Sequence, residues 1–172
     1  MSELRTRRLV VRRFTPADLE DFCAYQADPE VRRYMSGDPM DADQAAKYLS
    51  SQAVLDEREI KAWHDYAVEL AESGTVIGNV GVYLASEVEG DIGFQFHPGF
   101  HRQGYGLEAA TAFLAYLFEE LGLERVTAGC DPANDASHGL IGRLGLRPQA
   151  QAVTAGGYNY ELTREEWSAQ RA

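Results

Sequence analysis

The stretch "FHRQGYGLEAA", residues 100–110, has two glycines flanking one tyrosine directly before a helical pattern. Apolar residues then recur at helical spacing until Gly122, which predicts a helix that begins near Gly106 and ends at a glycine cap. The segment before the turn, "GDIGFQFH" at residues 90–97, is short and rich in aromatic residues, as is typical of a strand. The turn therefore joins a strand to a helix.

A turn of this kind suits a bound anion. The backbone N–H groups at the start of a helix have no partner inside it, and Gly104 and Gly106 let a ligand come close to the main chain. Arg102 adds a positive charge, so we expect a phosphate or pyrophosphate here. The lysine of an ATPase P-loop is absent, and the third glycine of a nicotinamide fingerprint is replaced by Ala109. An ordinary tight turn is the alternative that the motif alone leaves open.

The composition limits the classes of function. A chain of 172 residues fits one domain, and we expect a single domain over residues 1–172. Sixteen Lys and Arg against 27 Asp and Glu give a net charge of −11, which disfavours nucleic acid and anionic lipid and suits a cationic substrate. We find neither a secretion signal nor an apolar run of the roughly 18 residues that a membrane span needs. The sequence thus predicts a cytoplasmic protein.

The order of predicted elements indicates an α/β fold. A strand over residues 9–14 leads into helices, and three short strands between residues 63 and 97 fit an antiparallel meander. A helix follows the glycine turn, then a strand at 123–130, a helix at 134–145 and one or two closing strands. We expect a mixed, mostly antiparallel central sheet of six to seven strands flanked by about four helices. The glycine turn lies where ligands gather in such sheets.

The chain resembles the GCN5-related N-acetyltransferase (GNAT) superfamily, and within it the RimJ/RimL-like acetyltransferases of ribosomal-protein N-termini. The family signature is Gln or Arg, two residues, Gly, any residue, then Gly or Ala, and "HRQGYG" matches it except that His101 stands first. Three further segments match in the same order, namely residues 4–35, "NDASHGLIGRLGLR" at 134–147 and "YELTREEW" at 160–167. The resemblance therefore covers nearly the whole chain.

The resemblance implies the GNAT fold and acetyl-CoA as the acetyl donor, with no metal. It implies that the pyrophosphate binds residues 102–106, that the pantetheine arm runs along the backbone of Phe96 and His97, and that Asn134 and Ser137 lie near this arm. The implied cofactor-binding residues are Phe96, His97, Arg102, Gln103, Gly104, Tyr105, Gly106 and Asn134.

Acetylation of an amine needs a base for the amine and an acid for the leaving thiolate. Strand alternation puts Asp91 and His97 on one face of their strand, and the resemblance implies that Asp91 is the base, directly or through a water. A solvated residue at the strand entry is the alternative for Asp91, and His97 could also take a proton. Many relatives use a tyrosine as the acid where this chain has Ile141. Ser137 could position a water or protonate the thiolate, or it could simply cap a helix.

Two other readings of the polar residues are weaker. Cys130 and His138 invite a cysteine-nucleophile hypothesis, but a small apolar cysteine at the end of a buried strand needs no further explanation. The four histidines lack a tight metal-ligand spacing, so we expect no metal site.

The sequence thus predicts an N-acetyltransferase that acts by direct attack within a ternary complex. The acceptor is a protein N-terminal α-amine or a small cationic amine. A catalytically inactive CoA-binding sensor is the alternative, and an enzyme acting on nucleotide phosphates is a more remote one. We expect residues 36–44, which include three aspartates, and residues 152–157 to border the acceptor cleft, although a solvated loop explains these aspartates equally well. Exposed sheet edges could pair two chains into a homodimer.

Overall fold

The computed structural model describes residues 1–35, 37–154 and 157–171, with the backbone alone for 150–154 and 157–158. These residues contain one sheet of eight strands in the order β1-β2-β3-β4-β5-β6-β8-β7. Neighbouring strands are antiparallel except for β5 and β6, which are parallel. The strands are β1 (Leu4–Arg5), β2 (Leu9–Arg13), β3 (Trp63–Leu70), β4 (Val76–Leu84), β5 (Glu89–Phe96), β6 (Arg125–Cys130), β7 (Arg147–Thr154) and β8 (Gly157–Thr163).

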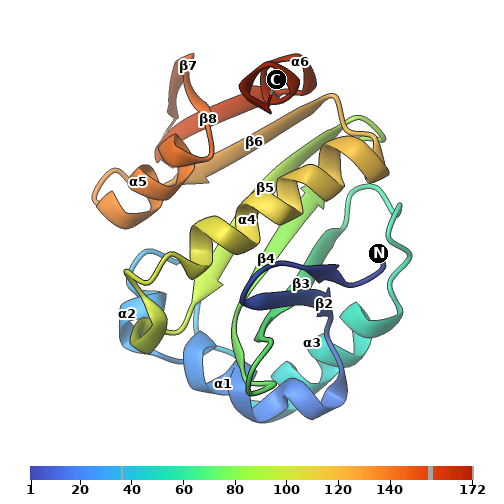
Figure 1. The fold of residues 1–172 in the computed structure, drawn as a ribbon. Helices are drawn as coiled ribbons and strands as arrows, with labels where there is room; N and C mark the ends of the chain where they lie inside the picture. Colours follow the sequence, from blue (N-terminus) through green and yellow to red (C-terminus); the bar gives the residue numbers. More distant parts are fainter. Residues whose placement is uncertain (36, 155–156, 172) are drawn as a thin grey trace.

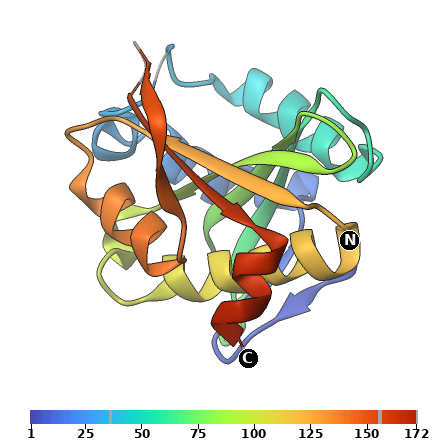
Figure 2. The same ribbon diagram turned by 90° about the horizontal axis from the view of Figure 1, so that it is seen from above.

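Helices cover both faces of the sheet (Figures 1 and 2). One face, here called the α3 face, carries α1 and α3, and the other, the α4 face, carries α4, α5 and α6. No helix within the described part of the chain is long and apolar enough to cross a membrane. The helices are α1 (Leu19–Gln26), α2 (Pro29–Arg32), α3 (Ala42–Val54), α4 (Tyr105–Ala115), α5 (Asp135–Arg143) and α6 (Arg164–Arg171).

Each face has its own core. On the α4 face, Phe113 and Leu117 pack with Ile92 of β5 in the larger cluster, so the apolar stripe after the glycine turn does face the sheet. On the α3 face, Phe14 and Leu49 belong to a smaller cluster. Helix α4 continues as a π-helical turn over residues 116–121 and ends at Gly122, whose φ of 93° suits a glycine cap as the sequence predicted.

The predicted numbers of strands and helices are too low. The described residues form eight strands and six α-helices, and several of these elements are too short to show a period in the sequence. Strand β1 has two residues and α2 has four. Helix α6 follows β8 without a loop, because Thr163 and Glu166 exchange hydrogen bonds between side chain and backbone at 3.0 and 3.3 Å.

A buried ion pair holds the chain where β2 enters the first helices. Asp18 is 6% exposed and accepts hydrogen bonds at 2.9 Å from both terminal nitrogens of Arg12. It also accepts the Thr15 backbone N–H at 2.7 Å. Burial alone would raise the pKa of Asp18, but the hydrogen bonds from Arg12 and Thr15 outweigh it, so the pKa lies below its ordinary value.

The substitution Asp18→Asn is expected to lower the free energy of unfolding by about 3 kcal/mol at pH 7, because Arg12, which also pairs with Glu69, loses the more deeply buried of its two carboxylate partners. Since the pKa of Asp18 is lower in the folded than in the unfolded chain, its stabilisation is fully present above about pH 4 and is lost as the pH falls through the folded-state value. Urea unfolding of both proteins at pH 7, 5 and 3 measures this. A difference that stays the same at all three pH values would contradict the assignment.

Candidate active site

The glycine turn forms the N-terminus of α4. Gly104 is the N-cap with a φ of 83°, and Arg102 also has a positive φ of 59°. The first intrahelical hydrogen bond runs from the Glu108 N–H to the Gly104 carbonyl at 3.0 Å, so the N–H groups before it point out of the helix end. A Cβ on Gly106 would stand 3.3 Å from Leu140, which explains the second glycine. The turn has the backbone geometry of an anion cradle.

Side chains around the turn hold its shape. His101, which departs from the family signature, donates from Nε2 to the Phe96 carbonyl at 2.8 Å. Gln103 donates from its amide to the Gly99 carbonyl at 3.1 Å, and His97 accepts the Gly99 N–H on Nδ1 at 3.0 Å. His97 therefore has a local structural role in this turn.

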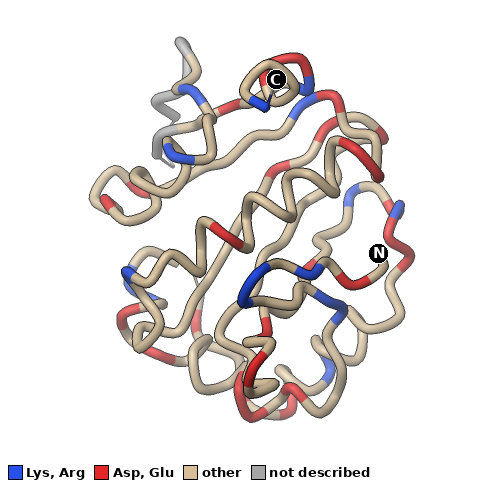
Figure 3. The backbone as a smooth tube through the Cα atoms, viewed as in Figure 1, with Lys and Arg blue, Asp and Glu red and all other residues tan. Residues whose placement is uncertain are grey.

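Arg8 anchors the turn from the hairpin of β1 and β2. Its Nη1 donates to the Gln103 carbonyl at 3.0 Å, its Nε donates to Glu108 at 2.7 Å, and its guanidinium lies 4.3 Å from the centre of the Tyr105 ring. Burial alone would raise the pKa of Glu108, but hydrogen bonds from Thr6 and Arg8 lower it. Figure 3 shows basic segments both in this hairpin and at the turn before α4. Sequence reasoning missed Arg8.

The strands on either side of the turn separate. Strands β5 and β6 pair only as far as Ile92 and Ala128, and then β6 continues with β8 while β5 continues with β4 (Figure 1). The His97 N–H donates to β4, so by alternation the backbone groups of Phe94 and Phe96 face the open edge. The Phe96 carbonyl already accepts a hydrogen bond from His101, so the Phe96 N–H is the group that fits the predicted contact with the pantetheine arm. The backbone N–H and carbonyl of His97 are already hydrogen-bonded. Phe94, and not His97, therefore has backbone groups that face this edge.

Asp91 lies one residue before this separation. It pairs with Thr127 across the parallel ladder, and its Oδ1 accepts the Thr127 hydroxyl at 2.7 Å. Its neighbours Ile92 and Phe94 pack into the core of the α4 face, so the carboxylate is on the α3 face, as strand alternation predicted. The side chain is half-buried. A hydrogen-bonded carboxylate therefore lies where the two strands begin to part.

Asn134 and Ser137 form the start of α5. Asn134 is the N-cap, and its Oδ1 accepts the Ser137 backbone N–H at 3.1 Å. Helix capping was the alternative role predicted for Ser137. In the structure, Asn134 has this role instead. Among the described residues, no hydrogen bond joins Ser137 to Asp91.

The structure does bring Cys130 and His138 together. The Cys130 sulfur lies 3.4 Å from His138 Nδ1, and this nitrogen lies 2.5 Å from the Tyr160 hydroxyl. Burial, with the nearby charge of Asp131, raises the pKa of the Cys130 thiol, which opposes a nucleophilic role. The part of the chain that the structure describes contains no group of three or more His, Cys, Asp or Glu side chains able to hold a metal ion.

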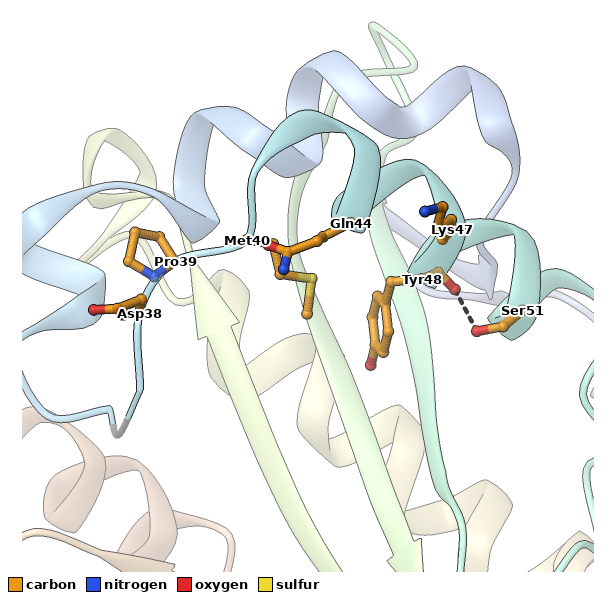
Figure 4. Close-up of a pocket in the computed structure, with 7 residues that line it drawn as sticks. All are labelled: Asp38, Pro39, Met40, Gln44, Lys47, Tyr48 and Ser51. Carbon is orange, nitrogen blue, oxygen red and sulfur yellow. Dashed lines mark hydrogen bonds between the residues drawn. The ribbon is translucent and has the colours of Figure 1, made fainter.

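An open cavity of about 560 Å³ lies beside α3. It includes part of the segment 36–44 that was expected to border the acceptor cleft, and Figure 4 shows the Tyr48 ring extending from α3 towards the strands. The other expected segment includes residues 155 and 156, which lie outside the described residues. The cavity is lined by Asp38, Pro39, Met40, Gln44, Lys47, Tyr48 and Ser51.

Comparison with known sequences agrees with this geometry. Residues 8–147 match the family described as the acetyltransferase (GNAT) domain. The chain belongs to the GNAT acetyltransferase family. It is therefore an acyltransferase by family, and GNAT acetyltransferases use acetyl-CoA.

Individual relatives extend over nearly the whole chain. The uncharacterised N-acetyltransferase YnaD of Bacillus subtilis is 28% identical over 174 residues, which cover 96% of this chain and 99% of YnaD. A GNAT acetyltransferase from Bacillus anthracis has a TM-score of 0.84 at 24% identity, covering 95% of this chain and 99% of that one. The aminoglycoside acetyltransferase AAC(6')-Ib, in complex with coenzyme A, has a TM-score of 0.76 at 17% identity, covering 95% and 99%. At these identities the solved structures establish the fold.

The residues present fit acetyl-CoA. The N–H groups at the start of α4 and the exposed Arg102 suit a pyrophosphate, and the open edge of Phe94 and Phe96 suits the amides of an extended arm. Acetyl-CoA supplies an activated acetyl thioester when bound. The protein's part is to position it, and Arg8 contributes by fixing the turn.

Replacing Arg8 with alanine is expected to raise the Kd for acetyl-CoA about tenfold, because binding must then order a turn that is no longer anchored. Calorimetric titration measures the Kd. Arg5→Ala is the matched control, since Arg5 is an exposed arginine of the same hairpin that pairs with Glu3. Equal Kd values for the two variants would show that Arg8 does not support the cradle.

Proposed function

We propose that the chain transfers an acetyl group from acetyl-CoA to a primary amine by direct attack in a ternary complex. The observation that carries this proposal is the position of Asp91. Its carboxylate lies beside the last paired residues of β5 and β6, and the anion cradle at Gly104 follows the end of β5. A base, an open strand edge and a phosphate site thus follow one another along a single stretch of chain.

The proposed reaction divides the proton transfers between two groups. The amine nitrogen forms a bond to the acetyl carbon while the carbon–sulfur bond breaks, so the amine loses a proton and the departing thiolate gains one. Thr127 binds one oxygen of Asp91, and we assign the amine proton to the other oxygen, directly or through a water. We assign the proton for the thiolate to the Ser137 hydroxyl, in the first turn of α5. Because Asp91 can act as the base, an inactive CoA-binding sensor is the weaker hypothesis.

The acceptor is proposed to be a protein N-terminal α-amine or a small cationic amine. The matches of residues 4–35, 134–147 and 160–167 support the RimJ/RimL-like subgroup and thus a peptide acceptor. The net charge of −11 and Asp38 in the cavity beside α3 support either kind of cation. A single N-acetyltransferase domain over residues 1–172, a cytoplasmic location and a homodimer also stay predictions from the sequence.

Asp91→Ala is expected to lower kcat about a hundredfold or more while the Kd for acetyl-CoA stays unchanged, because the substitution removes a proton acceptor but leaves the cradle intact. Thiol release with a panel of diamines and peptide amides measures turnover, and calorimetry measures binding. Glu89→Ala is the control, since Glu89 is an exposed carboxylate on the same strand. Unchanged turnover in Asp91→Ala would remove this residue from the mechanism.

A further inference from the structure

One edge of the indole of Trp63, the first residue of β3, reaches two neighbouring strands on the α3 face. A Cβ on Gly93 of β5 would stand 3.1 and 3.2 Å from the six-membered ring of Trp63. A Cβ on Gly81 of β4 would stand 3.0 Å from the indole nitrogen. Both glycines are in strand interiors, where glycine weakens a sheet unless something must approach the backbone closely. At Gly93 the group that approaches is the indole, and at Gly81 it is first the Asp65 carboxylate, with the indole nitrogen beside it.

Asp65 holds this indole in place. It is 7% exposed and accepts hydrogen bonds from the Trp63 indole N–H, from the Asn79 amide at 2.8 Å and from the Tyr48 hydroxyl. Its own backbone N–H donates to Gln52 at 2.9 Å. Because three hydrogen bonds hold the Asp65 carboxylate, it restricts rotation of the Trp63 ring. Tyr48 also lines the cavity beside α3, so this network connects the indole to that cavity.

The indole reaches the neighbourhood of Asp91. Asp91 and Gly93 are two residues apart on the same face of β5, a spacing of about 7 Å. Since the ring edge would stand 3.1 Å from a Cβ on Gly93, it lies within roughly 10 Å of the Asp91 backbone. Trp63 is half-buried, so part of the residue is open to solvent. An aromatic surface is therefore held next to the proposed base.

We propose that the exposed face of Trp63 binds the ammonium group of the acceptor and makes this site specific for positively charged primary amines. This inference rests on the proposed acetyl transfer and names the chemistry by which the acceptor is chosen. The ring face attracts cations through its quadrupole. The half-buried carboxylate of Asp91 beside the ring acts in the same direction. A neutral acceptor of the same shape gains none of these interactions.

Fluorescence of Trp63 tests the proposal without any turnover. The chain has two tryptophans, and Trp167→Phe leaves Trp63 as the only indole. The phenyl ring at position 167 of α6 can still stack on Phe118. In this background, diaminobutane is compared with uncharged butanediol, and trialanine amide is compared with its N-acetyl form. We expect a saturable change in emission with at least one charged probe, at a Kd about tenfold lower than for its uncharged counterpart. Response to diaminobutane alone, or to the peptide alone, identifies the source of the ammonium.

Two variants separate a binding surface from a merely structural tryptophan. Gly93→Ala adds a Cβ against the ring and is expected to abolish the response, whereas Gly142→Ala, where a Cβ meets nothing within 4 Å, preserves it. Trp63→Phe is expected to raise the KM for the acceptor about tenfold with the Kd for acetyl-CoA unchanged. Equal responses to charged and uncharged probes, or none to either, would overturn the proposal. Failure of acetyl-CoA to bind would instead count against the proposed function, because the Trp63 titration needs no acetyl-CoA.

Discussion

Strands β5 and β6 run parallel as far as Ile92 and Ala128 and then separate, while β6 stays paired with β8 and β5 with β4. This separation leaves the backbone groups of Phe94 and the N–H of Phe96 on an open edge, and backbone polar groups need partners. An extended ligand with its own amides meets that need. Asp91 lies at the start of the separation, and the N-terminus of α4 lies beyond its end. The phosphate cradle, the strand edge and the proposed base thus depend on one feature of the sheet.

The two faces of the sheet differ in electrostatic character. On the α4 face, backbone N–H groups with Arg8 and Arg102 favour an anion, although the chain as a whole carries a net charge of −11. On the α3 face, the half-buried carboxylate of Asp91 favours a cation. An anionic donor and a cationic acceptor can therefore approach from opposite sides and meet where the strands part. The hairpin that carries Arg8 is therefore part of the site, because Arg8 anchors the glycine turn.

Local patterns in the sequence predicted local structure well. The glycine at position 104 and the apolar spacing after it predicted the turn and helix, and alternation along β5 predicted the face of Asp91. Features that join distant segments were not predictable in this way. Arg8 meets Gln103 across 95 positions in the chain, and the contact of Trp63 with Gly93 depends on the register of three strands. The edge role of Phe94 was likewise hidden, because the direction of its backbone hydrogen bonds follows from pairing and not from residue type.

Binding of acetyl-CoA to the purified protein is the most direct test of this account. Calorimetric titration with acetyl-CoA, ATP and NAD in parallel should show saturable binding for acetyl-CoA alone, because the turn lacks the P-loop lysine and the third glycine of a nicotinamide site. Such a result would establish the donor before any acceptor is known. No binding of acetyl-CoA to protein shown to be folded would contradict the account, since the turn before α4 would then be structural only.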